Sequence, residues 1–142
     1  MKRILLVCIL ILATLLFGCN RMNTPDEFWS AVNDKEFTIK DIGHGPGTGL
    51  YFYAKDASRF CIYLIYGSGL PVAGYIKYKI SIDEIGSITI LEIEPFVSEI
   101  LQDPSMKETF DFRYTRKGII FDGDLFVDRS FEAHHDVIDE VA

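Results

Sequence analysis

The chain has 142 residues, of which 49% are hydrophobic, and 14 basic against 21 acidic residues give a formal net charge of −7. This length predicts a single domain with a real core. The negative charge disfavours nucleic acid as a partner, because binding it requires a basic surface.

The amino-terminal segment has the organisation of a secretory signal. Met1-Lys2-Arg3 is basic, Ile4 to Phe17 is a run of 14 uncharged residues, and the small residue Gly18 follows. A basic start, an apolar run and a small residue before the cleavage site are the parts of such a signal. The run is shorter than the roughly 20 residues that a membrane-spanning helix needs.

Leu16, Gly18 and Cys19 resemble the lipobox of bacterial lipoproteins. The resemblance implies cleavage before Cys19, fatty acylation of Cys19, and a domain held outside the cytoplasm on the cell membrane or the outer membrane. Two or three acyl chains anchor a protein stably. We therefore expect a signal peptide at 1–18, a lipid-anchored tether at 19–23 and one β-rich domain at 24–142.

The sequence Thr24-Pro25-Asp26-Glu27 predicts the start of a helix that runs to about Lys35. Thr24 suits the N-cap, Pro25 the first helical position, and Glu27 completes a capping box.

Strand patterns then follow one another along the chain. They cover 37–42, 50–53, 60–66, 75–83, 88–93, 110–114, 119–121 and 125–127. The segments at 50–53 and 60–66 are apolar on both faces. The segment at 75–83 alternates, with Ile76, Tyr78, Ile80 and Ile82 inward and Tyr75, Lys77, Lys79, Ser81 and Asp83 outward. Phe110, Phe112 and Tyr114 are expected inward as well.

Two details of the strand region predict local geometry. Ile88 and Ile90 share one parity, whereas Leu91 and Ile93 share the other, and this slip indicates a β-bulge. Lys117-Gly118 and Asp122-Gly123 predict tight turns between the last strands.

One short helix is expected at Pro95–Gln102, and Ser130–Val141 could form a terminal helix. The fold class is therefore mainly β: an antiparallel meander of about eight strands, forming a small barrel or a sandwich, with an N-terminal helix and one short inserted helix. The order of elements loosely resembles the small lipocalin-like domains of bacterial lipoproteins.

Few residues point to chemistry. Cys61 lies between apolar neighbours and is expected in the core.

His134-His135-Asp136 is the one potential metal cluster, but adjacent helical residues diverge by about 100°, so a solvated terminal segment is favoured. His44 lies in the glycine-rich segment Gly43–Gly49, which lacks the lysine of a phosphate loop and is interpreted as a strand connection. The acidic residues after 121 predict a solvated surface.

Tyrosine is concentrated on consecutive strands, at positions 51, 53, 63, 66, 75 and 78. Packing explains most of it, yet an apolar cavity or an aromatic patch remains open. We expect no catalytic residue, metal or cofactor. Three functions follow in order: a non-catalytic β domain that binds a small apolar ligand, a protein-interaction module of the cell envelope, and an enzyme with an unidentified site.

Overall fold

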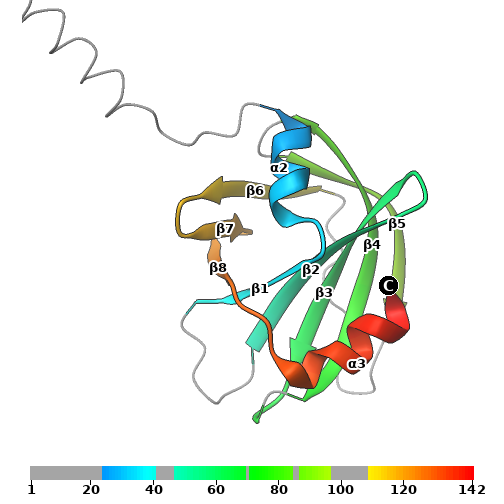
Figure 1. Cartoon of the computed structure of the whole chain (residues 1–142), viewed down its shortest axis with the longest axis vertical. Coiled ribbons are helices and arrows are strands. Elements are labelled where there is room, and N and C mark those ends of the chain that lie inside the picture. Colours follow the sequence, from blue (N-terminus) through cyan, green and yellow to red (C-terminus); the bar gives the residue numbers. More distant parts are fainter. Residues whose placement is uncertain (1–23, 41–46, 70, 85–86, 97–108) are drawn as a thin grey trace, which may run out of the picture.

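The computed structural model describes residues 24–40, 47–69, 71–84, 87–96 and 109–142, so the signal segment and Cys19 lie outside the described residues. Two helices and eight strands make up the fold (Figure 1). They are α2 (Pro25–Val32), β1 (Lys35–Ile39), β2 (Gly47–Lys55), β3 (Ser58–Tyr66), β4 (Val72–Glu84), β5 (Ser87–Phe96), β6 (Thr109–Thr115), β7 (Gly118–Phe121), β8 (Asp124–Asp128) and α3 (Glu132–Val141).

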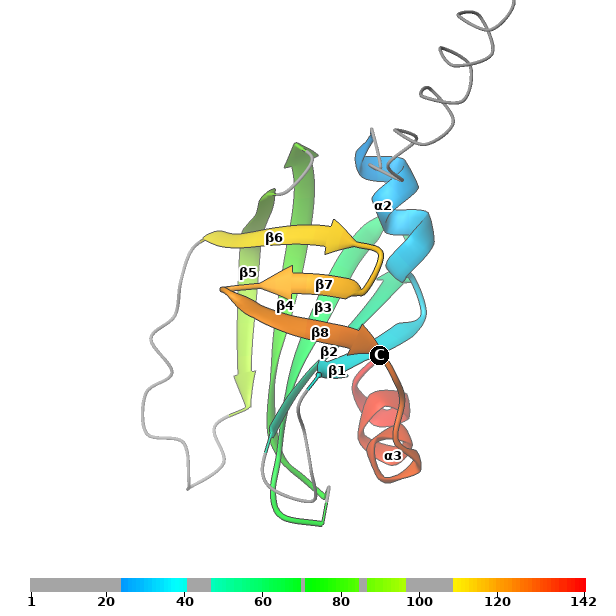
Figure 2. The same cartoon turned by 90° about the vertical axis from the view of Figure 1, so that its left-hand side faces the viewer.

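The strands form an antiparallel meander, as the sequence predicts. Each pairs with the next along the chain, and β8 pairs with β1 to close a barrel. Strands β2 to β5 have 9 to 13 residues, whereas β6, β7 and β8 have 7, 4 and 5. The long strands therefore make a curled half-barrel sheet, and the short ones complete the wall over part of its height (Figure 2).

Helix α2 begins where the capping box predicts. The Thr24 side chain accepts a hydrogen bond from the Glu27 amide, and the Glu27 carboxylate accepts one from the Thr24 amide. The helix ends at Val32, three residues before the expected Lys35, because Asp34 adopts a left-handed conformation with φ of 56°. Phe28 and Val32 are buried in the barrel core, so α2 packs across one end of the interior.

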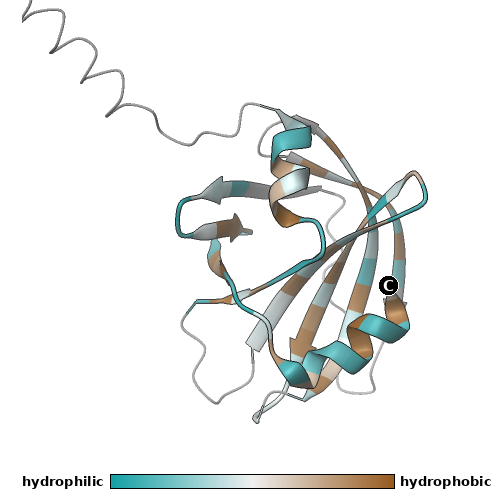
Figure 3. Cartoon of the chain, viewed as in Figure 1, coloured by the Kyte–Doolittle hydropathy of each residue, from teal (hydrophilic) through white to brown (hydrophobic). Residues whose placement is uncertain are grey.

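The long strands bury both of their faces, which explains the apolar runs at 50–53 and 60–66. One face contributes Leu50, Phe52 and Cys61 to the barrel interior. The opposite face carries Tyr53, Ile62, Leu64 and Tyr66, which pack with α3. Figure 3 shows apolar residues recurring along the strands behind α3, which itself carries both apolar and polar positions.

The alternation in β4 is confirmed: Ile76, Tyr78, Ile80 and Ile82 are all buried in the interior. The predicted bulge in β5 is present, since Lys79 pairs with Glu92 while Ile80 pairs with Ile90. Leu91 is the extra residue and is 55% exposed, whereas Ile93 returns to the core.

The turns after β6 and β7 follow their sequence signals. Asp122 and Gly123 have φ of 50° and 96°, which suits a tight hairpin turn. Gly118 has φ of 137°, and a Cβ there would lie 1.9 Å from the Phe126 carbonyl oxygen. Only glycine fits that position.

Three expectations need correction. Strand β1 starts at Lys35 and ends at Ile39, earlier than the predicted 37–42. Pro95 and Phe96 belong to β5, so the inserted helix does not begin there; the rest of it lies outside the described residues. Gly47 to Gly49 belong to β2 rather than to a connection. The terminal helix is confirmed as α3.

Candidate functional site

The barrel interior holds one continuous apolar cluster. All eight strands contribute side chains to it, and Phe28 and Val32 add those of α2. Phe52 lies edge-to-face with both Phe28 and Phe37, each with ring centroids 6.2 Å apart. Tyr78 is buried there as well, and desolvation raises its pKa to about 12. These contacts are those of a packed core.

Cys61 belongs to this interior and is 3% exposed, which confirms the expectation of a core cysteine. Burial raises the pKa of its thiol well above the usual range. A reactive cysteine needs an electropositive, accessible environment that lowers its pKa. Cys61 is therefore not placed to act as a nucleophile.

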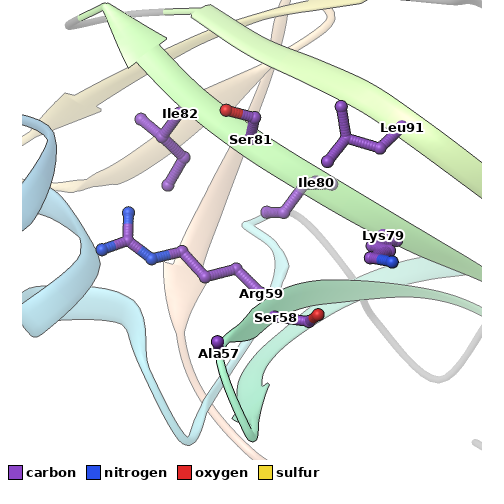
Figure 4. A pocket seen from close by; sticks show the side chains of 8 residues that line it. All are labelled: Ala57, Ser58, Arg59, Lys79, Ile80, Ser81, Ile82 and Leu91. Atoms are coloured by element: carbon purple, nitrogen blue, oxygen red, sulfur yellow. The ribbon is translucent and has the colours of Figure 1, made fainter.

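A depression of about 350 Å³ opens on the surface where β4 continues past the end of β3 (Figure 4). Its lining residues are Ala57, Ser58, Arg59, Lys79, Ile80, Ser81, Ile82 and Leu91. We call this depression the β3–β4 notch. Arg59 points from the notch towards α2. Its guanidinium donates a hydrogen bond to the Asp26 carboxylate at 3.0 Å, and its Cζ lies 5.1 Å from the centroid of the Trp29 ring. Lys79 pairs with Glu92 at 3.0 Å.

The second candidate is a buried polar pair between β1 and α3. Glu36 and His134 are 4% and 0% exposed, and His134 Nδ1 contacts Glu36 Oε1. Because a carboxylate only accepts hydrogen bonds, Nδ1 carries the proton. The other oxygen, Oε2, accepts from the Phe131 amide at 3.1 Å. We call Glu36 and His134 the buried pair.

The buried pair replaces a cap that α3 lacks. Phe131 occupies the N-cap, and no side chain of the helix caps its first turn. The Glu36 carboxylate satisfies the Phe131 amide from the neighbouring strand, and its negative charge suits a helix N-terminus. At the other end, Lys55 and Lys77 donate to the carbonyl oxygens of Ala142 and Val141 at 3.0 and 3.2 Å. Charges of the sheet thus complement both ends of the helix dipole.

Aromatic rings enclose the imidazole of His134. The Tyr66 ring centroid is 4.7 Å away and that of Phe131 is 5.2 Å away. Tyr66 donates its hydroxyl to the Thr48 carbonyl oxygen at 2.8 Å. Desolvation and the nearby Glu36 charge raise the Tyr66 pKa to about 12. Nε2 of His134 is buried and has no hydrogen-bond partner among the described residues.

The two histidines point in different directions from α3, as expected for adjacent helical residues that diverge by about 100°. The expectation that this segment is solvated is wrong for His134. His134 is fully buried, whereas His135 and Asp136 are exposed. His44 lies outside the described residues. No group of three or more His, Cys, Asp or Glu among the described residues could hold a metal ion. The acidic residues after 121 are all exposed, as expected.

Sequence reasoning missed Glu36, although a signal for its partner existed. His134, Val137, Ile138 and Val141 recur at positions i, i+3, i+4 and i+7, which is the spacing of one helix face. That stripe would have placed His134 on the buried side. Nothing near Glu36 in the sequence indicates a partner 98 residues away.

No family model matches this chain, and no curated protein and no solved structure matches it significantly. No helix in the described part of the chain is both long and apolar enough to cross a bilayer.

Proposed function

We propose that this protein is a lipid-anchored, non-catalytic binding module of the bacterial envelope, and that it binds its partner on the outside of the barrel. The observation that supports an outside surface is the apolar cluster inside the barrel. Apolar side chains from all eight strands and from α2 pack together there.

The β3–β4 notch is the surface that supports binding best. The bulge turns Leu91 outward at its edge, and bulges commonly redirect a side chain in this way. Arg59 and Lys79 are only 31% exposed, whereas their partners Asp26 and Glu92 are 87% and 63% exposed. Exposed ion pairs contribute little to stability, so a partner can exchange with these acids at small cost.

The position of the notch fits an anchored protein. Arg59 joins it to Asp26 in the first turn of α2. Five residues separate Cys19 from Pro25 in the sequence. An extended chain of that length spans at most about 20 Å. A lipid on Cys19 would therefore keep the notch near the membrane surface, where an envelope partner is found.

Catalysis is the less supported alternative. Two groups of buried side chains could be considered for chemistry: Cys61, whose pKa burial raises, and the buried pair, whose imidazole lies between the rings of Tyr66 and Phe131. A catalytic base must reach the proton that it removes from a substrate. Neither group is open to one.

Site-specific photo-crosslinking in the producing bacterium tests the binding surface. A photoreactive phenylalanine analogue at position 91 should give a discrete adduct with one envelope protein. The matched control carries the analogue at exposed His135 on α3 and should not give that adduct. The same adduct at both positions, or none at position 91, would contradict the proposal.

Metabolic labelling with a fatty acid tests the anchor separately. The unchanged chain should incorporate the label, and Cys19→Ala should not. Equal label on both proteins would rule out lipidation of Cys19 and leave the binding surface to the crosslinking result.

A further inference from the structure

Strand β4 is longer than the neighbour that it pairs with on one side. The register between β3 and β4 ends with Arg59 opposite Ile80, but β4 continues to Glu84. On the other side of β4, strand β5 continues to pair with it as far as Glu84. The described strands therefore offer Ile82 to Glu84 no strand partner on the β3 side. A strand edge of this kind is a template on which another extended chain can pair.

The β3–β4 notch opens at the start of this edge (Figure 4). Its lining comes from β3, β4, β5 and the turn before β3, and no residue of α2 is among the lining residues. The volume of about 350 Å³ lies in the range of pockets that hold ligands. The edge from Ile82 to Glu84 adds about 10 Å of strand. The notch and the edge together can therefore receive a short extended segment.

The charged side chains that line the notch are both cations, Arg59 and Lys79. Arg59 is the register partner of Ile80 and lies on the inner face of the sheet, whereas Lys79 lies on the outer face. Side chains of an added strand alternate between the same two faces, so an acidic side chain on either face would meet a cation. The net charge of −7 opposes an acidic partner, but physiological salt screens charges beyond about 8 Å. The lining charges therefore decide which partner fits.

The present contacts of these cations leave room for exchange. Their partners Asp26 and Glu92 are 87% and 63% exposed, and exposed ion pairs contribute little to stability. Carboxylates of a bound chain can replace them at small cost. Leu91 is exposed in the lining and adds an apolar contact.

We propose that the notch receives an extended acidic segment of an envelope protein, which adds to β4 as a short strand beyond the end of β3. This inference rests on the proposed function, because it names the class of partner that the notch binds. Main-chain hydrogen bonds to β4 hold the segment, and its acidic side chains pair with Arg59 and Lys79. In strand addition of this kind, main-chain bonds give affinity and alternate side chains give specificity.

Amide hydrogen exchange of the whole chain in a non-ionic detergent, titrated with synthetic peptides, tests the partner class. A hexapeptide of alternating glutamate and valine should protect amides within Ile82 to Glu84. The matched peptide of alternating lysine and valine should bind about tenfold more weakly, because its charges face cations of the same sign. Equal affinity for the two peptides, or tighter binding of the lysine peptide, would overturn the proposal.

Methylation of the peptide nitrogens tests the strand pairing. In an extended segment, alternate amides point to opposite edges, so only one alternate set can donate to β4. Two versions of the glutamate peptide, each methylated on one set, should differ in affinity by about tenfold. Equal affinities for the two versions would overturn strand addition. Protection of Ile82 to Glu84 that rises with protein concentration in the absence of peptide would identify a second copy as the occupant and overturn the proposal as well.

Variants of the lining identify the cations. Arg59→Gln and Lys79→Gln should each weaken binding of the glutamate peptide by about threefold, and the exposed control Lys117→Gln should not. Unchanged affinity in both lining variants would contradict the proposed charge pairs.

The crosslinking result separates this inference from the proposed function. An adduct from position 91 without binding of the glutamate peptide would keep the notch as a binding surface and overturn only the acidic segment. The absence of that adduct would contradict the proposed function itself, whatever the peptides do.

Discussion

The two faces of strands β2 to β4 are both buried, but they are buried in different ways. The interior face packs Leu50, Phe52 and Cys61 against the other strands and α2. The outer face packs Tyr53, Ile62 and Tyr66 against a single helix, α3. Glu36, Thr38 and His134 are the buried polar residues among those described. Glu36 and Thr38 flank the interior residue Phe37 along β1 and so lie on the outer face, and His134 lies on α3.

This difference shows what each surface requires. The interior is enclosed by a continuous hydrogen-bonded barrel, so apolar packing alone is enough there. Helix α3 packs on the strands without being hydrogen-bonded into the sheet, and only His134 and Ile138 of the helix are buried. Hydrogen bonds at both of its ends therefore fix the position of the helix, which apolar packing alone does not specify.

The largest effect should come from the interior. Phe52→Ala should lower the free energy of unfolding by about 3–5 kcal/mol, because it loses transfer free energy and leaves a cavity beside Phe28 and Phe37. Denaturant unfolding measures this loss. The exposed control Lys117→Ala should remain within about ±0.5 kcal/mol. Equal midpoints for the two variants would mean that the interior is not the main core.

A smaller and local effect is expected on the outer face. Ile138→Ala removes the buried apolar side chain of α3 and should cost about 2–3 kcal/mol. Hydrogen exchange should show faster opening of α3 amides and unchanged protection in β7. The exposed neighbour Asp139→Ala serves as the control. A loss of protection that spreads to β7 would show that the two clusters open together.

The charge at the end of α3 should contribute less. Lys55→Ala removes a cation from the C-terminus of the helix and should weaken α3 by about 0.3–1 kcal/mol at low ionic strength. The effect should shrink as salt is added, because salt screens exposed charges. Exchange of α3 amides at low and high salt measures it. A loss that does not vary with salt would assign the role of Lys55 to packing.

The smallest effect on stability belongs to the notch. Leu91 is exposed at the bulge, so Leu91→Ala should change the free energy of unfolding by no more than about 0.5 kcal/mol. The same substitution can be tested in a chain that carries the photoreactive group at position 58 in place of Ser58. There, Leu91→Ala should reduce crosslinking to the partner that position 91 captures. A large loss of stability would show that Leu91 packs in the fold and is not available for binding.

The local features of the fold were predictable from the sequence. The capping box at Thr24, the Asp122-Gly123 turn, the inward face of β4 and the bulge at Leu91 depend on neighbouring residues, and all are present. Periodicity also indicated that 50–53 and 60–66 bury both faces. It could not indicate what covers each face, because that depends on residues far away in the chain.

The buried pair could not be predicted from the sequence. Glu36 alternates with apolar residues on β1, and local pattern places such an acid in solvent. It is buried because the chain returns 98 residues later and sets an uncapped helix over it. The closure of the barrel between β1 and β8 likewise depends on residues that are far apart in the sequence. The pattern of each strand does not indicate whether the first and last strands of a meander pair with each other.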